Sequence, residues 1–395
     1  MTNRIDEYRR LADQLDRRRI GRRDFLRRAA MLGISPLVAE ATIRVVGFTV
    51  PNAEWGAAKA QEPGRLVVAS WGGAFGDAQR EAHFAPFMEE TGIEVVLSSQ
   101  SPELALLEAQ VTTGNVEWDV ANNSLVGAAT VASKGLLQPI DYSQMDASIV
   151  AGIDPFVRGE YSCGIYYWSS CIAWSTVDFP TDGPQPTTWA DFWDVGKFVG
   201  PRGLTSMDFE PPPLEVPLLA MGVAPADIYP LDIEKAFSIL TDFRPQIHTW
   251  LGWTADGMQL MTQGELSMAS VGNGAFVNAQ NEGQRVGMSY NQGMLYYDAW
   301  VIPKGAPNPT LAHKFIEFTM RPDVQANFSK LYPVGAVVQG ANAFLSEAQQ
   351  AQALSNPALK SQMFEVSVGW WGALASGTGK TNLERVYDRW ATWIL

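Results

Sequence analysis

The chain has 395 residues, which is too long for a single hydrophobic core and predicts two domains. Apolar residues make up 46% and charged residues 18%, as in a globular protein. Beyond residue 60 the chain holds 17 basic and 35 acidic side chains, and so acidic a surface lacks the basic footprint that nucleic-acid binding requires. We therefore expect no nucleic-acid partner.

The first 60 residues differ in composition from the rest. They hold 12 of the 29 basic residues and only 7 of the 42 acidic ones. Arg22-Arg23 and Phe25-Leu26 precede an apolar segment, 29–39, and a small-x-small cleavage pattern follows at Ala58-Lys59-Ala60. Paired arginines followed by Phe-Leu resemble a twin-arginine export signal, so residues 1–60 are predicted to be signal and linker. A basic N-terminal helix that stays attached is the alternative.

Residues 65–97 predict a strand, a turn, a helix and a second strand. Leu66–Ala69 is a short apolar run, typical of a buried parallel strand. Trp71 and three glycines follow and predict a turn, after which a helical pattern runs over 77–91. In such a unit a ligand meets the carboxyl end of the first strand, where Trp71 and the glycines lie.

Two aromatic stretches predict strands that cross between lobes. Helices and strands alternate along 101–140 and extend the first α/β lobe. Glu160–Trp174 is β-rich and nearly uncharged, so we interpret it as a crossing with a bend near Trp168. Residues 295–303 are the predicted return crossing and 331–335 a third. A chain that leaves one lobe and returns forms a cleft, and hinged closure around a ligand is the motion of that architecture.

The second lobe contains clear helix-start signals. Thr188, Asp232 and Thr254 are placed as N-caps. The loop 208–216 carries three carboxylates and three consecutive prolines, and 383–395 closes the chain as an amphipathic helix.

Motifs for catalysis or metal binding are missing from the sequence. The three histidines have no ligand spacing, and no serine has the glycine pattern of a nucleophile elbow. We predict no enzyme activity, no metal and no cofactor. Carboxylate pairs could be drawn from Asp208, Glu210, Glu215 and Asp298, which keeps a secreted hydrolase of the glycosidase kind as an alternative.

The two cysteines, Cys163 and Cys171, lie eight positions apart. An oxidising compartment permits a disulfide between them, across a bent strand pair. Separation in sequence does not fix the geometry, so the pattern leaves the disulfide open.

A series of short motifs runs through the chain in a specific order. They are Ser70-Trp71-Gly72-Gly73, Trp118-Asp119-Val120, residues 135–141, 189–194, 214–216, 229–232, 273–274 and 301–305. In this order they resemble the periplasmic solute-binding proteins of the spermidine/putrescine-binding type, the receptors of ABC importers. The resemblance covers nearly everything from residue 65 to residue 395.

The resemblance implies an α/β fold of the type II periplasmic-binding-protein kind. Each of two lobes would be a sheet flanked by helices, with hinge crossings between them. Lobe 1 would comprise 62–164 plus 298–333, and lobe 2 would comprise 165–297 plus 334–395. The protein would be a periplasmic monomer that delivers a ligand to an ABC permease in the inner membrane. A ligand sensor for a membrane receptor is an alternative.

The resemblance also implies a binding site. In polyamine-binding relatives an aromatic residue follows the first strand, which matches Trp71. An aromatic residue and an aspartate precede the Ile-Pro of the return crossing, which matches Tyr296 and Asp298. The aspartate would hold an ammonium group, and a carboxylate of the loop 208–216 would hold the other amine. The loop offers Asp208, Glu210 and Glu215.

We expect a polyamine-like organic cation, or another small polar solute, as the ligand. Gly272 stands where relatives carry a tryptophan, so one wall of a polyamine site is missing. The candidate ligand-binding residues are Trp71, Gly72, Gly73, Trp168, Asp208, Glu215, Asn273, Tyr296, Asp298 and Trp371.

Overall fold

The computed structural model describes residues 2–17, 20–32, 34, 38–39, 42–43, 64–253 and 255–395. The predicted cap Thr254 and the cleavage pattern at 58–60 lie outside the described residues. Within these ranges, no helix combines the length and apolarity that crossing a bilayer requires.

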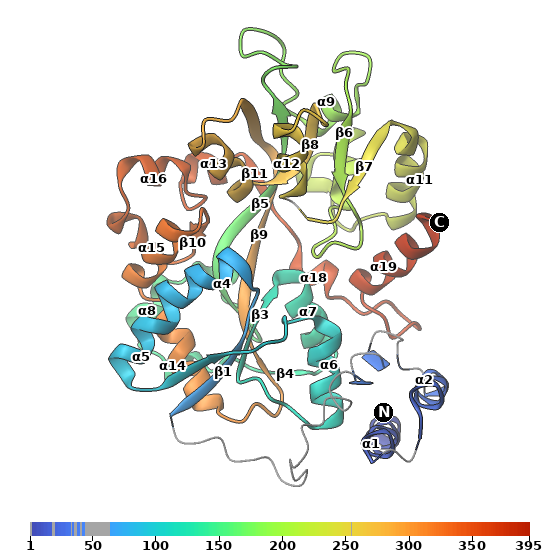
Figure 1. Ribbon diagram of the computed structural model, residues 1–395, viewed down its shortest axis with the longest axis vertical. Coiled ribbons are helices and arrows are strands. Elements are labelled where there is room, and N and C mark those ends of the chain that lie inside the picture. Colours follow the sequence, from blue (N-terminus) through green and yellow to red (C-terminus); the bar gives the residue numbers. More distant parts are fainter. Residues whose placement is uncertain are drawn as a thin grey trace.

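Two long antiparallel strands, β5 (Cys163–Ser175) and β9 (Val286–Pro303), run through both halves of the molecule (Figure 1). They contain the two aromatic stretches that the sequence predicts as crossings. One mixed sheet of eleven strands forms around them in the order β2-β1-β3-β9-β5-β8-β6-β7. β10 pairs with β5, whereas β4 and β11 pair with β9. The β5–β9 register shifts at two places, between Gly164 and Tyr166 and between Ser170 and Ile172.

We call the half that contains β1–β4 the first lobe. Its strands are β1 (Arg65–Ala69), β2 (Glu94–Leu97), β3 (Val120–Ser124) and β4 (Leu137–Gln138). Its helices are α4 (Gly73–Gln79), α5 (Ala85–Thr91), α6 (Leu104–Thr113), α7 (Leu125–Ser133), α8 (Ala147–Gly152), α14 (Pro309–Thr319) and α15 (Pro322–Leu331).

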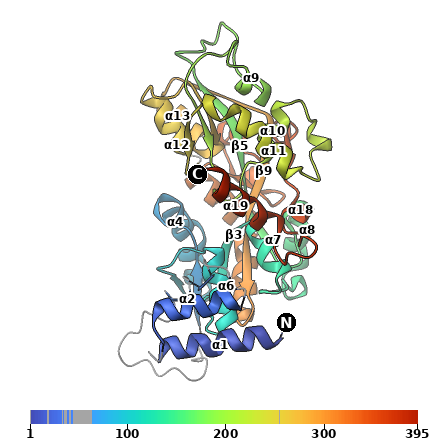
Figure 2. The ribbon, with the colours of Figure 1, turned by 90° about the vertical axis from the view of Figure 1, so that its right-hand side faces the viewer.

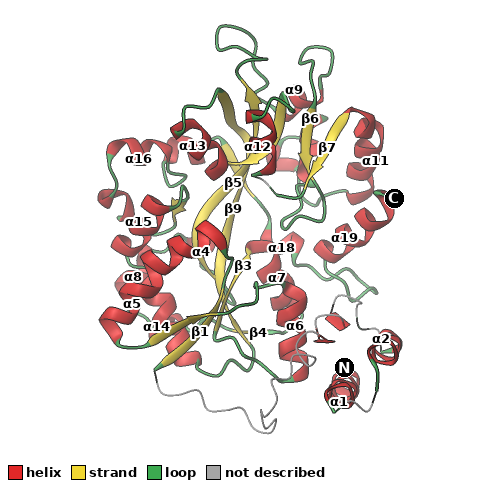
Figure 3. Ribbon diagram, in the orientation of Figure 1, coloured by secondary structure: helices red, strands yellow, loops and turns green. Residues whose placement is uncertain are grey.

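The half that contains β6–β8 is the second lobe, and Figure 2 shows both lobes from the side. Its strands are β6 (Arg202–Thr205), β7 (Ile247–Leu251) and β8 (Met268–Gly272). Its helices are α9 (Trp189–Trp193), α10 (Glu215–Ala220), α11 (Ile233–Phe243), α12 (Asp256–Thr262), α13 (Asn273–Asn281) and α19 (Asn382–Trp393). The segment between α15 and α19 forms β10 (Gly335–Ala336), α16 (Glu347–Gln352), α17 (Pro357–Lys360), β11 (Met363–Glu365) and α18 (Val368–Trp371). Helices flank the strands of both lobes (Figure 3).

Two of the predicted caps, Thr188 and Asp232, lie at helix starts. Thr188 and Asp191 form a reciprocal capping box, and the Asp232 side chain accepts from the Lys235 amide at 3.0 Å. The first helix begins at Gly73 rather than at Asp77, because the glycine stretch forms its first turn. A Cβ on Gly76 would lie 2.7 Å from the Trp71 carbonyl oxygen, so glycine lets the helix start directly against the end of β1.

The N-terminal region forms two packed helices, α1 (Thr2–Asp16) and α2 (Arg22–Met31). Tyr8, Phe25 and Ala29 are buried in a small cluster of this region. α1 also contacts α6, where Arg9 Nε donates to the Thr112 carbonyl oxygen at 2.7 Å. These residues belong to the segment that the sequence predicts to be an export signal.

Cys163 and Cys171 form no disulfide, which answers a question that their spacing in the sequence left open. Both cysteines are buried free thiols. They lie on the same strand, β5, where eight residues of extended chain span roughly 26 Å. Disulfide-bonded cysteines need Cα atoms within about 7 Å of each other, so a bend sharp enough to join these two does not occur.

Candidate functional site

Asp298 lies at the point where β9 passes between the lobes, and only 7% of its surface is exposed. The Tyr166 hydroxyl donates to Asp298 Oδ2 at 2.6 Å, and Trp168 Nε1 donates to Oδ1 at 3.0 Å. Burial raises the pKa of Asp298, and hydrogen bonds from Tyr166, Trp168 and Trp71 oppose that rise. The carboxylate is therefore held in a fixed orientation by donors from two strands and the end of β1.

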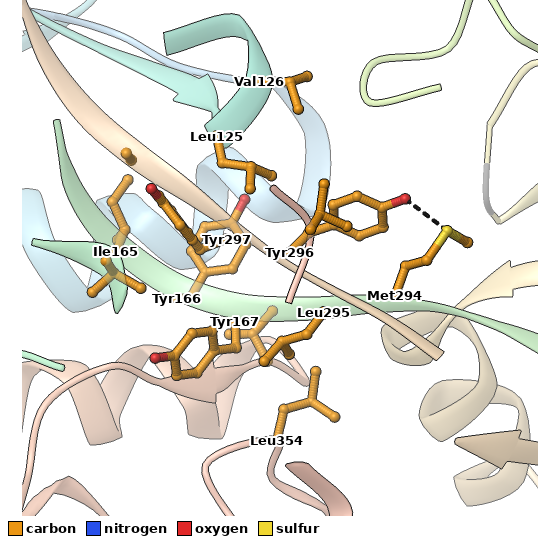
Figure 4. Close-up of a cluster of buried hydrophobic side chains, with 14 of the residues drawn as sticks. Leu125, Val126, Ile165, Tyr166, Tyr167, Met294, Leu295, Tyr296, Tyr297 and Leu354 are labelled. Carbon is orange, nitrogen blue, oxygen red and sulfur yellow. Dashed lines mark hydrogen bonds between the residues drawn. The ribbon is translucent and has the colours of Figure 1, made fainter. Parts of the chain in front are cut away.

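Aromatic rings form a wall beside this carboxylate. Trp168 stacks on Tyr296 with ring centroids 4.5 Å apart, and Phe209 meets Trp168 edge-on at 6.3 Å. The Tyr296 hydroxyl donates to the Met294 sulfur at 3.2 Å (Figure 4). Trp168 and Phe209 are partly exposed, whereas Tyr296 is buried beneath Trp168, and exposed aromatic rings can make cation–π contacts.

Strand alternation explains why these side chains meet. Tyr166 pairs with Asp298 across β5 and β9, and Trp168 pairs with Tyr296 two positions along. Side chains two residues apart share one face of a sheet, so all four lie on the same face. The intervening pair, Tyr167 and Tyr297, lies on the opposite face.

The opposite face of the same two strands carries an internal ion cluster. Lys360 Nζ lies 2.8 Å from Asp154 Oδ2 and 3.8 Å from Glu365 Oε1. The same ammonium group lies 4.6 Å from the Tyr167 ring centroid and 6.0 Å from that of Phe156. A groove of about 560 Å³ opens next to this cluster, lined by Phe156, Tyr297 and Glu365 among others. It does not contain Asp298 or the aromatic wall, so it is distinct from the predicted site.

Glu215 and Trp371, both predicted ligand-binding residues, contact each other inside the second lobe. Both are fully buried, and Trp371 Nε1 donates to Glu215 Oε1 at 3.0 Å. The Tyr229 hydroxyl donates to the same oxygen, whereas Oε2 has no hydrogen-bond partner among the described residues. Burial raises the pKa of Glu215 to about 7. Its negative charge also acts on the buried hydroxyl of Tyr296, which brings Glu215 near the aromatic wall.

Glu210, one of three carboxylates that the sequence could not rank, lies between the lobes. Its Oε1 accepts from Ser124 Oγ at 2.8 Å, and Ser124 belongs to the first lobe. Burial raises the pKa of Glu210 to about 7, hydrogen bonds from Ser124 and Tyr387 oppose the rise, and the charge of Asp298 adds to it. By contrast, Asp208 is exposed and accepts from Ser206.

The remaining predicted residues are spread around this centre. Asn273 Oδ1 accepts from the Ser169 amide at 2.9 Å, and its Nδ2 donates to the Pro333 carbonyl at 3.2 Å. Asn273 therefore connects β5 to the segment that follows α15. Gly72 and Gly73 are exposed at the start of α4, next to Trp71.

Two residues of this arrangement, Tyr166 and Ser124, were missed from the sequence. Both lie opposite Asp298, across β5 and across β3 respectively. A tyrosine two positions before Trp168 was a visible signal, because a strand puts such residues on one face. No sequence signal identifies Ser124, because its place depends on the pairing of β3 with β9.

The carboxylates of this region have no basic partner. No lysine or arginine of the described ranges forms an ion pair with Asp208, Glu210, Glu215 or Asp298. The described residues also contain no cluster of three or more histidines, cysteines or carboxylates suited to a metal ion. Glu215 and Asp298 are buried, and a buried carboxylate without a counter-charge is energetically costly.

The chain belongs to the bacterial extracellular solute-binding proteins, because the model of that family matches residues 82–359. Its fold is the two-lobed fold of the periplasmic binding proteins. An ABC transporter substrate-binding protein from Bradyrhizobium japonicum superposes with a TM-score of 0.75 at 32% identity, covering 84% of this chain and 99% of that one. The protein is thus a solute-binding protein of an ABC transporter that binds a small ligand.

Two relatives of known ligand differ in what they bind. The gamma-aminobutyric acid-binding protein of Pseudomonas aeruginosa is 33% identical over 85% of this chain and 93% of its own. The spermidine/putrescine-binding periplasmic protein of Escherichia coli is 24% identical over 60% of this chain and 68% of its own. The stronger similarity is to the amino-acid binder, so the comparisons do not support the expected preference for polyamines.

Proposed function

We propose that the protein captures a small solute with an ammonium group and holds that group at Asp298. The observation that carries this proposal is a buried carboxylate, fixed by Tyr166 and Trp168, beside stacked rings and without an internal counter-ion. Ionic hydrogen bonds to the carboxylate and cation–π contact with Trp168 or Trp71 would orient the ammonium group. Polyamine-like cations and ω-amino acids such as gamma-aminobutyric acid both satisfy this requirement.

The cluster around Lys360 supports the proposal because it shows the same chemistry within the chain. There a lysine ammonium occupies a place bounded by two carboxylates and two aromatic rings. The face with Asp298 has carboxylates and rings of the same kind but no lysine. A ligand ammonium would complete it.

Glu215 supports a second polar contact for the ligand. Its Oε2 is buried without a partner, and its carboxyl lies close enough to Tyr296 to affect that hydroxyl. A ligand that extends along Tyr296 from Asp298 would bring its far end toward Glu215. An amine there would bind the ionised carboxylate, whereas a ligand carboxylate would accept a hydrogen bond from the protonated form.

Capture would proceed by hinge closure over the ligand, followed by delivery to an ABC permease in the inner membrane. The proposed lobes remain 62–164 plus 298–333 and 165–297 plus 334–395. Because α18 contacts α7, residues 368–371 meet both lobes. Export by the twin-arginine route to the periplasm, and a monomeric state, complete the proposal.

A melting panel on the full chain tests the proposed ligand class. Gamma-aminobutyric acid, putrescine, spermidine, neutral amino acids and sugars are added one at a time, and the melting temperature is recorded. At a concentration 100 times Kd, a ligand stabilises the folded form by about 2.7 kcal/mol. We expect a shift with at least one amine and none with sugars. Shifts with sugars alone would refute the ammonium site.

A further inference from the structure

Glu210 reaches from the second lobe onto the first turn of α7. Ser124 caps α7, and its Oγ accepts from the Gly127 amide at 3.1 Å while it donates to Glu210 Oε1 at 2.8 Å. A Cβ on Gly127 would lie 2.2 Å from that same carboxylate oxygen. Glycine at position 127 therefore leaves room for the Glu210 carboxylate in this position.

This position of the Glu210 carboxylate is close to Asp298. Ser124 is the cross-strand partner of Asp298 in the β3–β9 ladder, and such partners have Cα atoms about 5 Å apart. Glu210 also receives a hydrogen bond from Tyr387 of α19. Glu210 and Asp298 thus belong to one small region, and no lysine or arginine of the described residues pairs with either.

We propose that Glu210 and Asp298 together hold one cationic group of the ligand, and that Glu210 thereby fastens the second lobe to the start of α7. This rests on the proposed function, because it assigns a second carboxylate to the same ammonium-bearing ligand. Lys360, shared between Asp154 and Glu365, is the internal example of one ammonium held by two carboxylates. Ligand charge then contributes directly to closure, since the cation bridges the lobes.

Without a bound cation, a proton on Glu210 would neutralise its carboxylate and so also favour closure of the lobes. Its pKa is raised to about 7, first by burial and further by the charge of Asp298, while Ser124 and Tyr387 oppose the rise. A group whose pKa is raised in the closed form favours that form when protonated, so ligand-free closure is promoted below pH 7 and is lost as pH rises through 7. The ligand cation competes with this proton for Glu210, so the affinity of the protein for the cation should rise as pH increases through 7.

Small-angle X-ray scattering of the ligand-free full chain tests the closure role. The wild type is expected to have a smaller radius of gyration at pH 5.5 than at pH 8.5. Glu210→Gln, which imitates the protonated form, should keep the smaller radius at both pH values. Asp182→Asn, an exposed carboxylate on a turn of the second lobe outside the candidate ligand-binding residues, is the matched control and should behave like the wild type. The closure role would be overturned if the radius of gyration of the wild type did not change with pH, or if it still changed with pH in Glu210→Gln.

Calorimetric titration with putrescine and with gamma-aminobutyric acid tests the cation site. Wild-type affinity for the amine that binds should rise about tenfold from pH 6 to pH 8, as expected for a competing proton with a pKa near 7. Glu210→Gln should bind about tenfold or more weakly at pH 8 and lose this pH dependence. Unchanged affinity in Glu210→Gln would overturn the present inference alone. Binding of neither amine to the wild type would instead overturn the proposed function, and the scattering result would then decide the closure role of Glu210.

Discussion

The two faces of the β5–β9 strand pair contain the same kinds of residue but differ in charge balance. Each face combines tyrosines with buried or half-buried carboxylates. On one face Lys360 lies between Asp154 and Glu365. On the other face, the donors to Asp298 among the described residues are neutral. The residue composition of the two faces does not distinguish them. They differ because Lys360 supplies a cation on one face.

This comparison separates a structural cluster from a candidate binding site. An internal lysine satisfies the carboxylates permanently, so that face needs nothing from solution. A carboxylate that is held in place but lacks a counter-charge retains binding energy for a ligand. The same reasoning applies to Glu210 and Glu215, whose pKa values are both raised to about 7 by burial.

The largest expected effect comes from removing the unbalanced charge. Asp298→Asn keeps the shape but removes the partner of the ligand ammonium, and breaking a buried charge pair costs about 3–5 kcal/mol. Titration calorimetry with the amine found in the melting panel should show a loss of affinity of at least about a hundredfold. The matched control on the other face, Asp154→Asn, should bind like the wild type. Equal losses of ligand affinity in Asp298→Asn and Asp154→Asn would contradict the assignment of the ligand site to the face with Asp298.

The next effect concerns the stability of the ligand-free protein. The pKa of Glu215 is raised from 4.5 to about 7, so its ionisation in the fold is unfavourable. That cost is absent below pH 4.5, grows between pH 4.5 and 7 and is complete above 7. Glu215→Gln should therefore be more stable than the wild type at pH 8, by up to about 3 kcal/mol, and not at pH 4.5. Urea unfolding at the two pH values measures this, and a variant that is less stable at pH 8 would contradict it.

A smaller effect is expected from the balanced face. Lys360→Met keeps the methylene chain but leaves Asp154 and Glu365 without their cation. Because the Lys360, Asp154 and Glu365 side chains are 28%, 32% and 49% exposed, solvent screening limits the loss to about 1 kcal/mol. Chemical denaturation should show this loss, and high salt should reduce it. Ligand affinity should not change, and a strong loss of binding would place this face within the site.

No effect is expected from reducing agents. Cys163 and Cys171 lie far apart along β5 as free thiols. Melting temperatures with and without dithiothreitol should agree, and alkylation in denaturant without reductant should modify both cysteines. Mass spectrometry that finds a linked peptide pair would contradict the strand geometry.

Local patterns of the sequence predicted much of the fold. The aromatic, uncharged runs identified β5 and β9, and the caps at Thr188 and Asp232 set two helix starts correctly. The first helix began four residues earlier than predicted because the glycines, which favour turns, also permit close packing of a helix start against Trp71. The cysteine spacing left the disulfide undecided, because separation in sequence does not say whether a strand bends.

The candidate site was harder to predict because it depends on pairing between distant strands. Motif positions placed Trp71, Tyr296 and Asp298 at one region. Tyr166 and Ser124 join them only through the registers of β5 and β3 against β9. The choice among three loop carboxylates likewise depended on which of them reaches α7, a contact made across 86 residues of chain.

The two register shifts in the β5–β9 ladder lie on either side of the segment Tyr166–Trp168. Bulges bend a strand pair where its hydrogen bonds are already interrupted. The strand pair can therefore bend at these two register shifts, while the regularly paired segment between them carries Tyr166 and Trp168. Motion of the lobes would then leave the hydrogen bonds from Tyr166 and Trp168 to Asp298 intact. The Asp298 carboxylate would have its ligand-binding orientation before the lobes close.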